Sequence, residues 1–388
     1  MERHYLDHCS SAPLRPEART AMAEALDVAA ADASRLHTEA IEVRHRIEVA
    51  RHQVAGLLGA RPREVVFTAS ATESLNTAIA GLVRRSPGPA VVTAAEHRAV
   101  TEAAATWTGL AAESAAAVVT VGICPDGRVD PAALVATVDE LIAAGRPPAM
   151  VACQLANHEV GAIQPIAEIA SALRDRRVPL VVDAAQAAGR IPIDAGTLDA
   201  TMIAVSGHKL GGPAGTGALV VRRGVRVDPL LVGTAQERDR RAGVENLVGI
   251  AGLGAACEAV GRSLDDEATA ARHHTATISD LLAELDGVEL FGPTEPGDRL
   301  PHLVCAGFAD LEPQAVLLGL DRAGIAAHSG SACAAEEIEP SPILAAMGAD
   351  AARSLRFGVG WSTTERDIGA LREVLPRVVS GLRALRPK

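Results

Sequence analysis

The chain has 388 residues and a formal net charge of −11, with 48% apolar and 22% charged residues. This composition is typical of a soluble globular protein, and the length predicts two domains rather than one core. The negative charge argues against a nucleic-acid surface, and the sequence shows neither a signal peptide nor an uncharged apolar run of about 20 residues, so we expect a cytoplasmic protein with no membrane segment.

The predicted elements begin with a polar, non-helical segment at residues 5–13, followed by helices at 16–28 and 39–58. From residue 59 onward, apolar strands alternate with helices. The strands are predicted at residues 65–68, 90–93, 118–121, 150–155, 180–183, 202–205 and 218–221, and the helices at 73–83, 99–107, 131–143 and 165–175. This alternation indicates a mostly parallel sheet covered on both faces, with a ligand beyond the carboxyl ends of its strands.

The C-terminal part has a different pattern. A helix at 245–260 is predicted to close the large domain, and a separate helix at 265–285 to connect it to the rest. The elements that follow are strands at 302–308 and 355–359 and helices at 312–323 and 364–384. We therefore predict an α/β fold whose large domain covers 14–260 and whose smaller α+β domain is formed by 1–13 and 261–388.

Lys209 is one of only two lysines in the chain, and the other is the last residue, Lys388. Arginine replaces lysine in surface ion pairs but cannot act as an amine nucleophile, so a lysine retained at this position suggests that a primary amine is needed. A strand at 201–205 leads to it, and a glycine-rich turn follows. The pattern indicates a Schiff base, either to a carbonyl substrate or to pyridoxal phosphate (PLP), rather than an ordinary loop lysine.

Polar residues also follow other predicted strands. Thr72 stands at the start of a helix, where free N–H groups bind phosphate, although a plain helix cap has the same pattern. His97 follows the strand at 90–93, and Asp183 ends the strand at 180–183. An acidic residue at the end of a buried strand needs a positive partner, and the protonated pyridine nitrogen of PLP is a suitable one.

Taken together, these residues make the sequence resemble PLP-dependent enzymes of fold type I in the class-V aminotransferase family, and within it the NifS/IscS-like cysteine desulfurases. The resemblance extends from Tyr5 to about Ile368. The matching stretches include Phe67-Thr68, Ala71-Thr72-Glu73-Ser74, Glu96-His97, Asn157-x-Glu159-Val160-Gly161, Val182-Asp183-Ala184-x-Gln186, Ser206-x-His208-Lys209, Ser329-Gly330-Ser331-Ala332-Cys333 and Ser354-Leu355-Arg356. The resemblance implies a seven-stranded sheet in the large domain and a homodimer.

It also implies roles for individual residues. Lys209 is expected to hold PLP and to move the α-proton of the substrate, Asp183 to pair with the pyridinium nitrogen, and His97 to stack on the ring and transfer protons. Arg356 is expected to bind the substrate carboxylate, because its fork of donors suits that group. The remaining cofactor contacts are assigned to Ala71, Thr72, Asn157, Gln186, Ser206 and His208, of which Asn157 is also expected to touch the substrate.

The resemblance also implies that Cys333 is the nucleophile, and its position among glycine and small residues, which suit a mobile loop better than a core, supports this role. Cys333 would take the sulfur of cysteine as a persulfide and release alanine. The other five cysteines are interpreted as small core residues, with a partial exception for Cys9 near the rim of the site. The scattered cysteines form no CxxC pair, so we predict no metal site and a reducing compartment.

The sequence departs from the family pattern near the substrate entrance and the phosphate end. The unusual residues are Cys9-Ser10-Ser11, Ser70, His158, Val244 and Trp361. Val244 replaces a threonine that donates to the phosphate of the partner subunit's PLP. Loss of such a hydrogen bond is worth about 0.5–1.5 kcal/mol, so we expect weaker PLP binding rather than none.

The main hypothesis is a homodimeric, PLP-dependent L-cysteine desulfurase that passes sulfur to an acceptor protein, with no direct nucleic-acid or membrane partner. The alternatives are a C–S lyase that forms pyruvate and sulfide without Cys333, a related selenocysteine lyase, and a degenerate scaffold that binds sulfur-transfer partners. The retained Lys209 argues against the scaffold.

Overall fold

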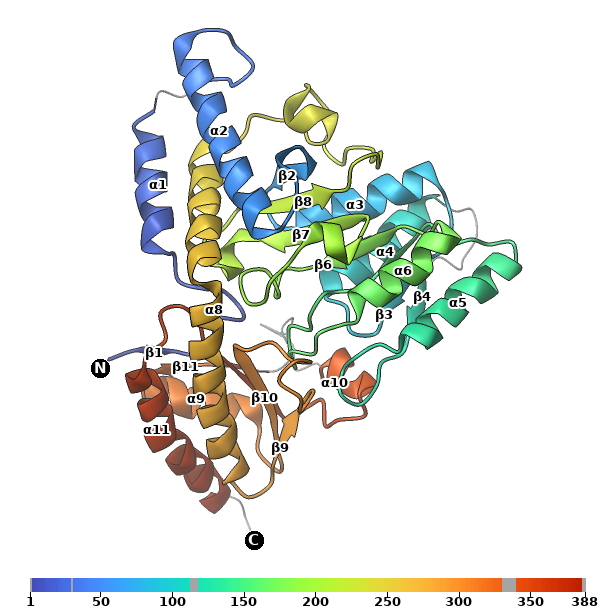
Figure 1. Ribbon diagram of the computed structural model, residues 1–388. Helices are drawn as coiled ribbons and strands as arrows, with labels where there is room; N and C mark the ends of the chain where they lie inside the picture. The colour runs from blue at the N-terminus through green and yellow to red at the C-terminus, as the bar shows by residue number, and fades with distance from the viewer. Residues whose placement is uncertain (1, 29–30, 112–117, 330–339, 386–388) are drawn as a thin grey trace.

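The computed structural model describes residues 2–28, 31–111, 118–329 and 340–385. Its largest element is a seven-stranded sheet in the order β2-β8-β7-β6-β5-β3-β4 (Figure 1). The strands are β2 (Val65–Thr68), β3 (Ala90–Thr93), β4 (Val118–Val121), β5 (Met150–Ala152), β6 (Leu180–Asp183), β7 (Met202–Ser206) and β8 (Gly217–Val221). All the strands predicted for this sheet are present, and β5 is shorter than predicted.

The strand directions confirm a mostly parallel sheet. β4, β3, β5, β6 and β7 run parallel to one another, whereas β8 is antiparallel to both of its neighbours, β7 and β2. β2 therefore points the same way as β7. As a result, every strand except β8 ends at the same edge of the sheet, where polar residues from distant parts of the sequence meet.

Alternate residues of these strands pack on opposite faces, as the period of a β-strand requires. One face is covered by α3 (Ala71–Arg85) and α4 (Arg98–Ala111), which pack on residues such as Val66 and Val92. Residues of the other face pack with those of α2 (Thr38–Leu57), α5 (Pro131–Ala143), α6 (Ile166–Arg176) and the first part of α8 (Leu247–Ala283). Burial on both faces explains why the strands are continuously apolar.

A smaller antiparallel sheet lies at the other end of α8 (Figure 1). Its strands, in spatial order, are β12 (His328–Ser329), β13 (Ser354–Gly358), β10 (Leu303–Phe308) and β9 (Val288–Phe291). The N-terminal segment lies beside it, because β1 (His4–Tyr5) pairs with β11 (Ile325–Ala326) and Leu6 joins the same apolar cluster. The helices of this part are α9 (Pro313–Arg322), α10 (Pro342–Ala346) and α11 (Glu365–Ala384).

α8 is one continuous helix of 37 residues, so the prediction of two separate helices is wrong. The intervening stretch contains Gly261 but no proline, and one glycine costs a helix only about 1 kcal/mol. The first part of α8 packs against α1 (Pro16–Leu26) and α2, and the last part against β9, β10 and α11. α8 is long and apolar enough to span a membrane, but 50% of its most apolar window is buried inside the protein.

The short elements complete the fold. They are helix α7 (Ala195–Leu198) and the 3-10 turns η1 (Pro62–Glu64), η2 (Gly207–Lys209) and η3 (Gln236–Asp239). Of these, η2 contributes most to the site, because it follows β7 directly at the edge of the sheet where the parallel strands end.

Candidate active site

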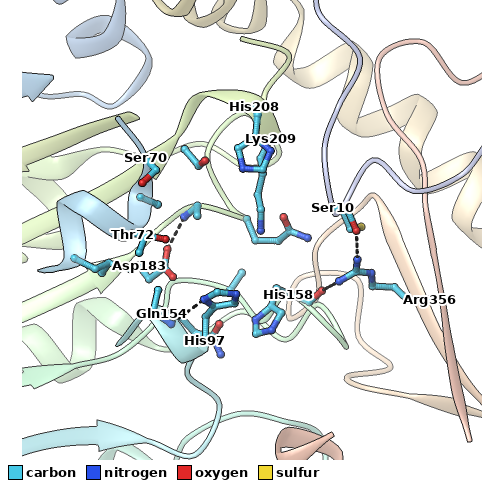
Figure 2. A pocket seen from close by; sticks show the side chains of 18 residues that line it. Ser10, Ser70, Thr72, His97, Gln154, His158, Asp183, His208, Lys209 and Arg356 are labelled. Atoms are coloured by element: carbon cyan, nitrogen blue, oxygen red, sulfur yellow. Dashed lines mark hydrogen bonds between the residues drawn. The ribbon is translucent and has the colours of Figure 1, made fainter. Parts of the chain in front are cut away.

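A cavity of about 250 Å³ lies at the edge of the seven-stranded sheet where the parallel strands end. Arg356 of β13 lies on its opposite side, so the cavity is bounded by both sheets (Figure 2). Among the residues predicted for the site, those that line the cavity are Ala71, Thr72, His97, Asp183, Gln186, Ser206, His208, Lys209 and Arg356.

At one end of the cavity, the lining residues Ser70 and Ser206 both lie beside Gly217, the first residue of β8. Gly217 pairs with Thr68 of β2 on one side and with Ser206 of β7 on the other. A Cβ atom on Gly217 would lie 2.7 Å from the carbonyl carbon of Ser70 and 2.8 Å from the carbonyl oxygen of Val205. The absence of a side chain therefore lets the turn after β2 approach the end of β7.

This turn begins α3. Ser70 is its N-cap, and its Oγ accepts a hydrogen bond from the Glu73 N–H at 3.1 Å. Ala71 and Thr72, in the first turn of the helix, line the cavity together with His208. Free N–H groups at a helix start, beside hydroxyl and imidazole groups, form a donor set that suits a phosphate.

Lys209 lies in η2, and its side chain enters the middle of the cavity (Figure 2). Burial lowers the pKa of its amine, and Arg356 lowers it further, while Asp183 acts in the opposite direction. A lowered pKa increases the fraction of unprotonated amine, which is the nucleophilic form. The turn is anchored by Arg190, whose Nη2 donates to the carbonyl oxygen of Lys209 at 3.0 Å.

Asp183 is the last residue of β6 and pairs with Ala204 of β7, which places its carboxyl group near the lysine turn. Its Oδ1 accepts a hydrogen bond from the Ala185 N–H at 2.8 Å. Nearby, Gln186 also lines the cavity, and its Nε2 is buried without a hydrogen-bond partner in the described part of the chain. The site thus offers a buried carboxylate and an unused amide donor to a ligand.

His97 has a defined tautomer. Its Nδ1 accepts a hydrogen bond from the Ala99 N–H at 3.0 Å, so the neutral ring carries its proton on Nε2. Burial lowers the pKa of His97, partly opposed by the charge of Asp183. The ring of His158 lies against it, with the ring centroids 5.1 Å apart and the planes at 72°.

Glu96 is a buried carboxyl group behind this side of the cavity. Its Oε1 accepts hydrogen bonds from the Thr93 hydroxyl at 2.6 Å and the Gln154 N–H at 2.9 Å, which ties the end of β3 to the segment after β5. Burial raises the pKa of Glu96 to about 7, and Asp183 acts in the same direction. Its other oxygen has no hydrogen-bond partner among the described residues.

Arg356 is almost fully buried, and its terminal nitrogens are already engaged. Nη1 donates to the carbonyl oxygen of His158 at 2.7 Å, and Nη2 donates to Ser10 Oγ at 2.9 Å and contacts Asp7 Oδ1 at 3.4 Å. The Nε–H group is buried without a hydrogen-bond partner in the described ranges. Arg356 is therefore held by the N-terminal segment and by the loop after β5.

The other two predicted residues are Asn157 and Cys333. Asn157 does not line the cavity, because its Oδ1 accepts from the N–H groups of Glu159 and Val160, both at 2.8 Å, and its Nδ2 donates to Ala95. Cys333 lies outside the described residues. Sequence reasoning gave no role to five polar residues that line the cavity. Gln154 is one of them, and the other four had been noted as departures from the family pattern: Cys9, Ser10, Ser70 and His158.

Comparison with known proteins adds the family. A family model for class-V aminotransferases matches residues 4–371. The chain belongs to the class-V aminotransferase family. An IscS-like cysteine desulfurase from Mycobacterium tuberculosis is 39% identical to this family member over 389 residues, covering 98% of this chain and 97% of that protein. The predicted resemblance is thereby confirmed.

Solved structures of this family agree with the fold. A NifS-like protein superposes with a TM-score of 0.87 at 26% identity, covering 99% of this chain and 100% of that chain. A structure of SspA in complex with cysteine superposes with a TM-score of 0.77 at 25% identity, covering 93% of this chain and 100% of that chain. The predicted fold type I architecture is confirmed.

The polar groups that line the cavity of this protein fit PLP chemically. The start of α3 suits the phosphate, Asp183 suits the pyridine nitrogen, Lys209 supplies the amine, and the unpaired Gln186 Nε2 suits a ring oxygen. In the described ranges, no group of three or more His, Cys, Asp or Glu residues could hold a metal ion.

Proposed function

We propose that this protein is a PLP-dependent L-cysteine desulfurase that converts L-cysteine to L-alanine and holds the sulfur as a persulfide on Cys333. The observation that carries the proposal is one cavity that contains a buried lysine amine, Asp183 and Arg356. Relatives named cysteine desulfurase, 39% and 34% identical over nearly the whole chain, support the reaction. The SspA structure in complex with cysteine supports the substrate.

When bound, PLP supplies an electron sink for the charge that develops at the α-carbon of the substrate. Lys209 holds the cofactor through its amine and then moves the α-proton, for which its lowered pKa is suitable. Asp183 keeps the pyridine nitrogen protonated. His97 offers its Nε2–H as a proton donor, because Nδ1 is occupied by the Ala99 N–H.

Cys333 provides the sulfur-accepting thiolate. It attacks the sulfur of cysteine, the carbon–sulfur bond breaks, and the α-amino acid that remains is released as alanine after proton transfer. The persulfide then passes to an acceptor protein, and the small residues that surround Cys333 in the sequence favour access to it. We place this chemistry in the cytoplasm, where thiols are kept reduced.

We further propose a homodimer and the domain division at 14–260 against 1–13 with 261–388. Val244 supports the dimer. The family places this position beside the phosphate bound by the partner subunit, and 69% of the Val244 surface is exposed in the single chain, as expected for a residue that faces a partner. The separate apolar clusters around the two sheets support the division. α8 crosses the proposed boundary without a break.

The deciding experiment measures product partition. The PLP-loaded protein is incubated with L-cysteine and a reductant, and alanine, pyruvate and sulfide are quantified. We expect alanine to match sulfide and both to be lost in Cys333→Ala. The matched control is Cys124→Ala, because Cys124 is exposed and does not line the cavity, and we expect it to remain fully active.

The opposite result is also informative. Pyruvate that matches sulfide, with Cys333→Ala still active, would replace desulfuration by β-elimination. In that case the protein would be a C–S lyase, and the unusual cavity residues Cys9 and His158 would be the first to examine.

A further inference from the structure

The loop after β5 presents His158, not Asn157, to the cavity. The Asn157 side chain is used within its own loop, where its amide oxygen accepts from the N–H groups of Glu159 and Val160 and its nitrogen donates to Ala95. These contacts use the amide oxygen and one of the two N–H donors of Nδ2, and the Asn157 side chain is fully buried. The adjacent His158 lines the cavity, so it is the residue of this pair that can touch a substrate.

His158 also lies next to the group expected to bind the substrate carboxylate. Figure 2 shows its ring between His97 and Arg356, and its own carbonyl oxygen accepts a hydrogen bond from Arg356 Nη1 at 2.7 Å. On its other side, the His158 ring packs against the ring of His97. A carboxylate that approaches Arg356 from the cavity therefore comes within reach of the His158 ring.

Arg356 alone has few free donors for such a carboxylate. Its two terminal nitrogens already donate to His158 and Ser10, and Nη2 also contacts the Asp7 carboxylate at 3.4 Å. A bidentate grip, the strongest mode of an arginine–carboxylate pair, needs two free N–H groups on one edge of the guanidinium. Because the guanidinium of Arg356 is already engaged, a substrate carboxylate can accept a further hydrogen bond from another residue.

The His158 ring has a donor to offer. No hydrogen bond to this ring occurs within the described ranges, and the nearest carboxyl oxygen, Glu159 Oε1, lies 3.7 Å from Nε2. Burial holds the pKa of His158 well below its usual range, with His97, Lys209 and Arg356 acting in the same direction. A neutral imidazole keeps one N–H donor and one lone pair.

We propose that His158 binds the α-carboxylate of the amino-acid substrate together with Arg356, and that it takes the substrate contact predicted for Asn157. This inference rests on the proposed function only in that the substrate is an amino acid. His158 is thus a substrate-binding residue that distinguishes this cavity from those with asparagine at the same place in the motif.

The test compares two ligands that differ only in the carboxylate. Binding of L-alanine and of ethylamine to the PLP-loaded protein is measured by calorimetry for the parent, His158→Phe and His158→Gln. Phenylalanine keeps an aromatic ring against His97 but has no N–H group, whereas glutamine keeps a donor. Thermal unfolding and cofactor content establish that each variant is folded and loaded.

We expect His158→Phe to weaken L-alanine binding about tenfold or more, the size of a hydrogen bond to a charged group, and to leave ethylamine binding unchanged. His158→Gln should recover part of the loss. Unchanged L-alanine binding in His158→Phe, or equal weakening of both ligands, would overturn the inference. If His158→Phe does not fold, His158→Ala replaces it in the same comparison with His158→Gln.

Asn157→Ala tests the alternative that Asn157 binds the substrate. We expect it to lower thermal stability, because it removes the loop hydrogen bonds, without a selective loss of L-alanine binding; a selective loss would return the role to Asn157. The proposed function is tested separately. A parent protein whose L-alanine binding depends on His158, but which forms no alanine from L-cysteine, would contradict desulfuration and leave this inference intact.

Discussion

Gly217 and Ser70 are in direct backbone contact where β8 begins beside the start of α3, because a Cβ on Gly217 would lie 2.7 Å from the Ser70 carbonyl carbon. We predict that Gly217→Ala moves the turn before α3 away from β7. The expected cost is about 1–3 kcal/mol of unfolding free energy, typical of overpacking, with a loss of PLP affinity. Urea denaturation and cofactor titration measure the two effects.

The matched control for this variant is Gly261→Ala in α8. A Cβ added to Gly261 would meet no atom within 4 Å, so alanine there should stabilise the helix by about 0.5–1 kcal/mol and leave PLP affinity unchanged. Equal PLP affinity in Gly217→Ala and the parent would contradict the role of this contact.

The assignment of Lys209 as the PLP-binding residue can be tested with few variants. The chain has only two lysines, so Lys209→Ala should abolish turnover and the absorbance of the bound cofactor, while Lys388→Ala should change neither. Lys209→Arg should behave like Lys209→Ala, because a guanidinium cannot serve as the amine. After borohydride reduction, mass spectrometry should find the cofactor on the Lys209 peptide; its recovery on Lys388 would contradict the assignment.

Glu96 predicts a pH dependence of stability. Its folded-state pKa of about 7 is above the ordinary 4.5, so the folded protein retains this proton between those values. Its contribution to the free energy of unfolding therefore falls as pH rises from about 4.5 to about 7, by at most about 3 kcal/mol. Relative to the parent, Glu96→Gln should gain stability across this range in urea denaturation at several pH values.

The control for the pH series is Glu102→Gln, whose carboxyl group lies on the exposed face of α4. We expect its stability to follow the parent at each pH. A stability difference between Glu96→Gln and the parent that is the same at pH 5 and at pH 8 would show that the Glu96 carboxyl group does not titrate in this range.

Arg51 and Glu237 form a buried, two-pronged ion pair, with N–O distances of 2.7 and 2.8 Å. Glu237 also accepts from the Phe67 N–H, and it begins three consecutive residues with positive φ. Glu237→Gln should cost about 3–5 kcal/mol, because it removes the charge of the buried partner of Arg51 and leaves the buried guanidinium with only the more exposed Glu48. Glu48→Gln, which removes the more exposed partner of Arg51, should cost no more than about 1 kcal/mol in the same urea assay.

The sequence predicted the large sheet well, because strands buried on both faces are continuous apolar runs with clear ends. It did not predict β9, in which only Phe291 is buried, nor the continuity of α8, since none of residues 261–270 is buried and no apolar pattern joins the two buried parts of the helix. At the site, two of the motif residues, Lys209 and Asp183, line the cavity.

The choice between Asn157 and His158 could not be made from the motif. Both residues belong to the same loop, and only the hydrogen bonds of Asn157 to the backbone show which of them turns inward. Cys9 and Ser10 are similar cases. They line the cavity only because β1 pairs with β11 and carries the N-terminal segment past Arg356, a contact between residues more than 300 positions apart in the chain.

The unbroken α8 has a mechanical consequence. With a rise of about 1.5 Å per residue, the 37 residues of α8 span about 55 Å. Helices α1 and α2 pack against α8 near one end, and β9 and α11 pack against it near the other. A free hinge at residues 261–264 would require breaking several helical hydrogen bonds. We therefore expect α8 to resist hinge motion between the part that carries Lys209 and the part that carries Arg356, which limits how far the distance between these two side chains can adjust to a substrate.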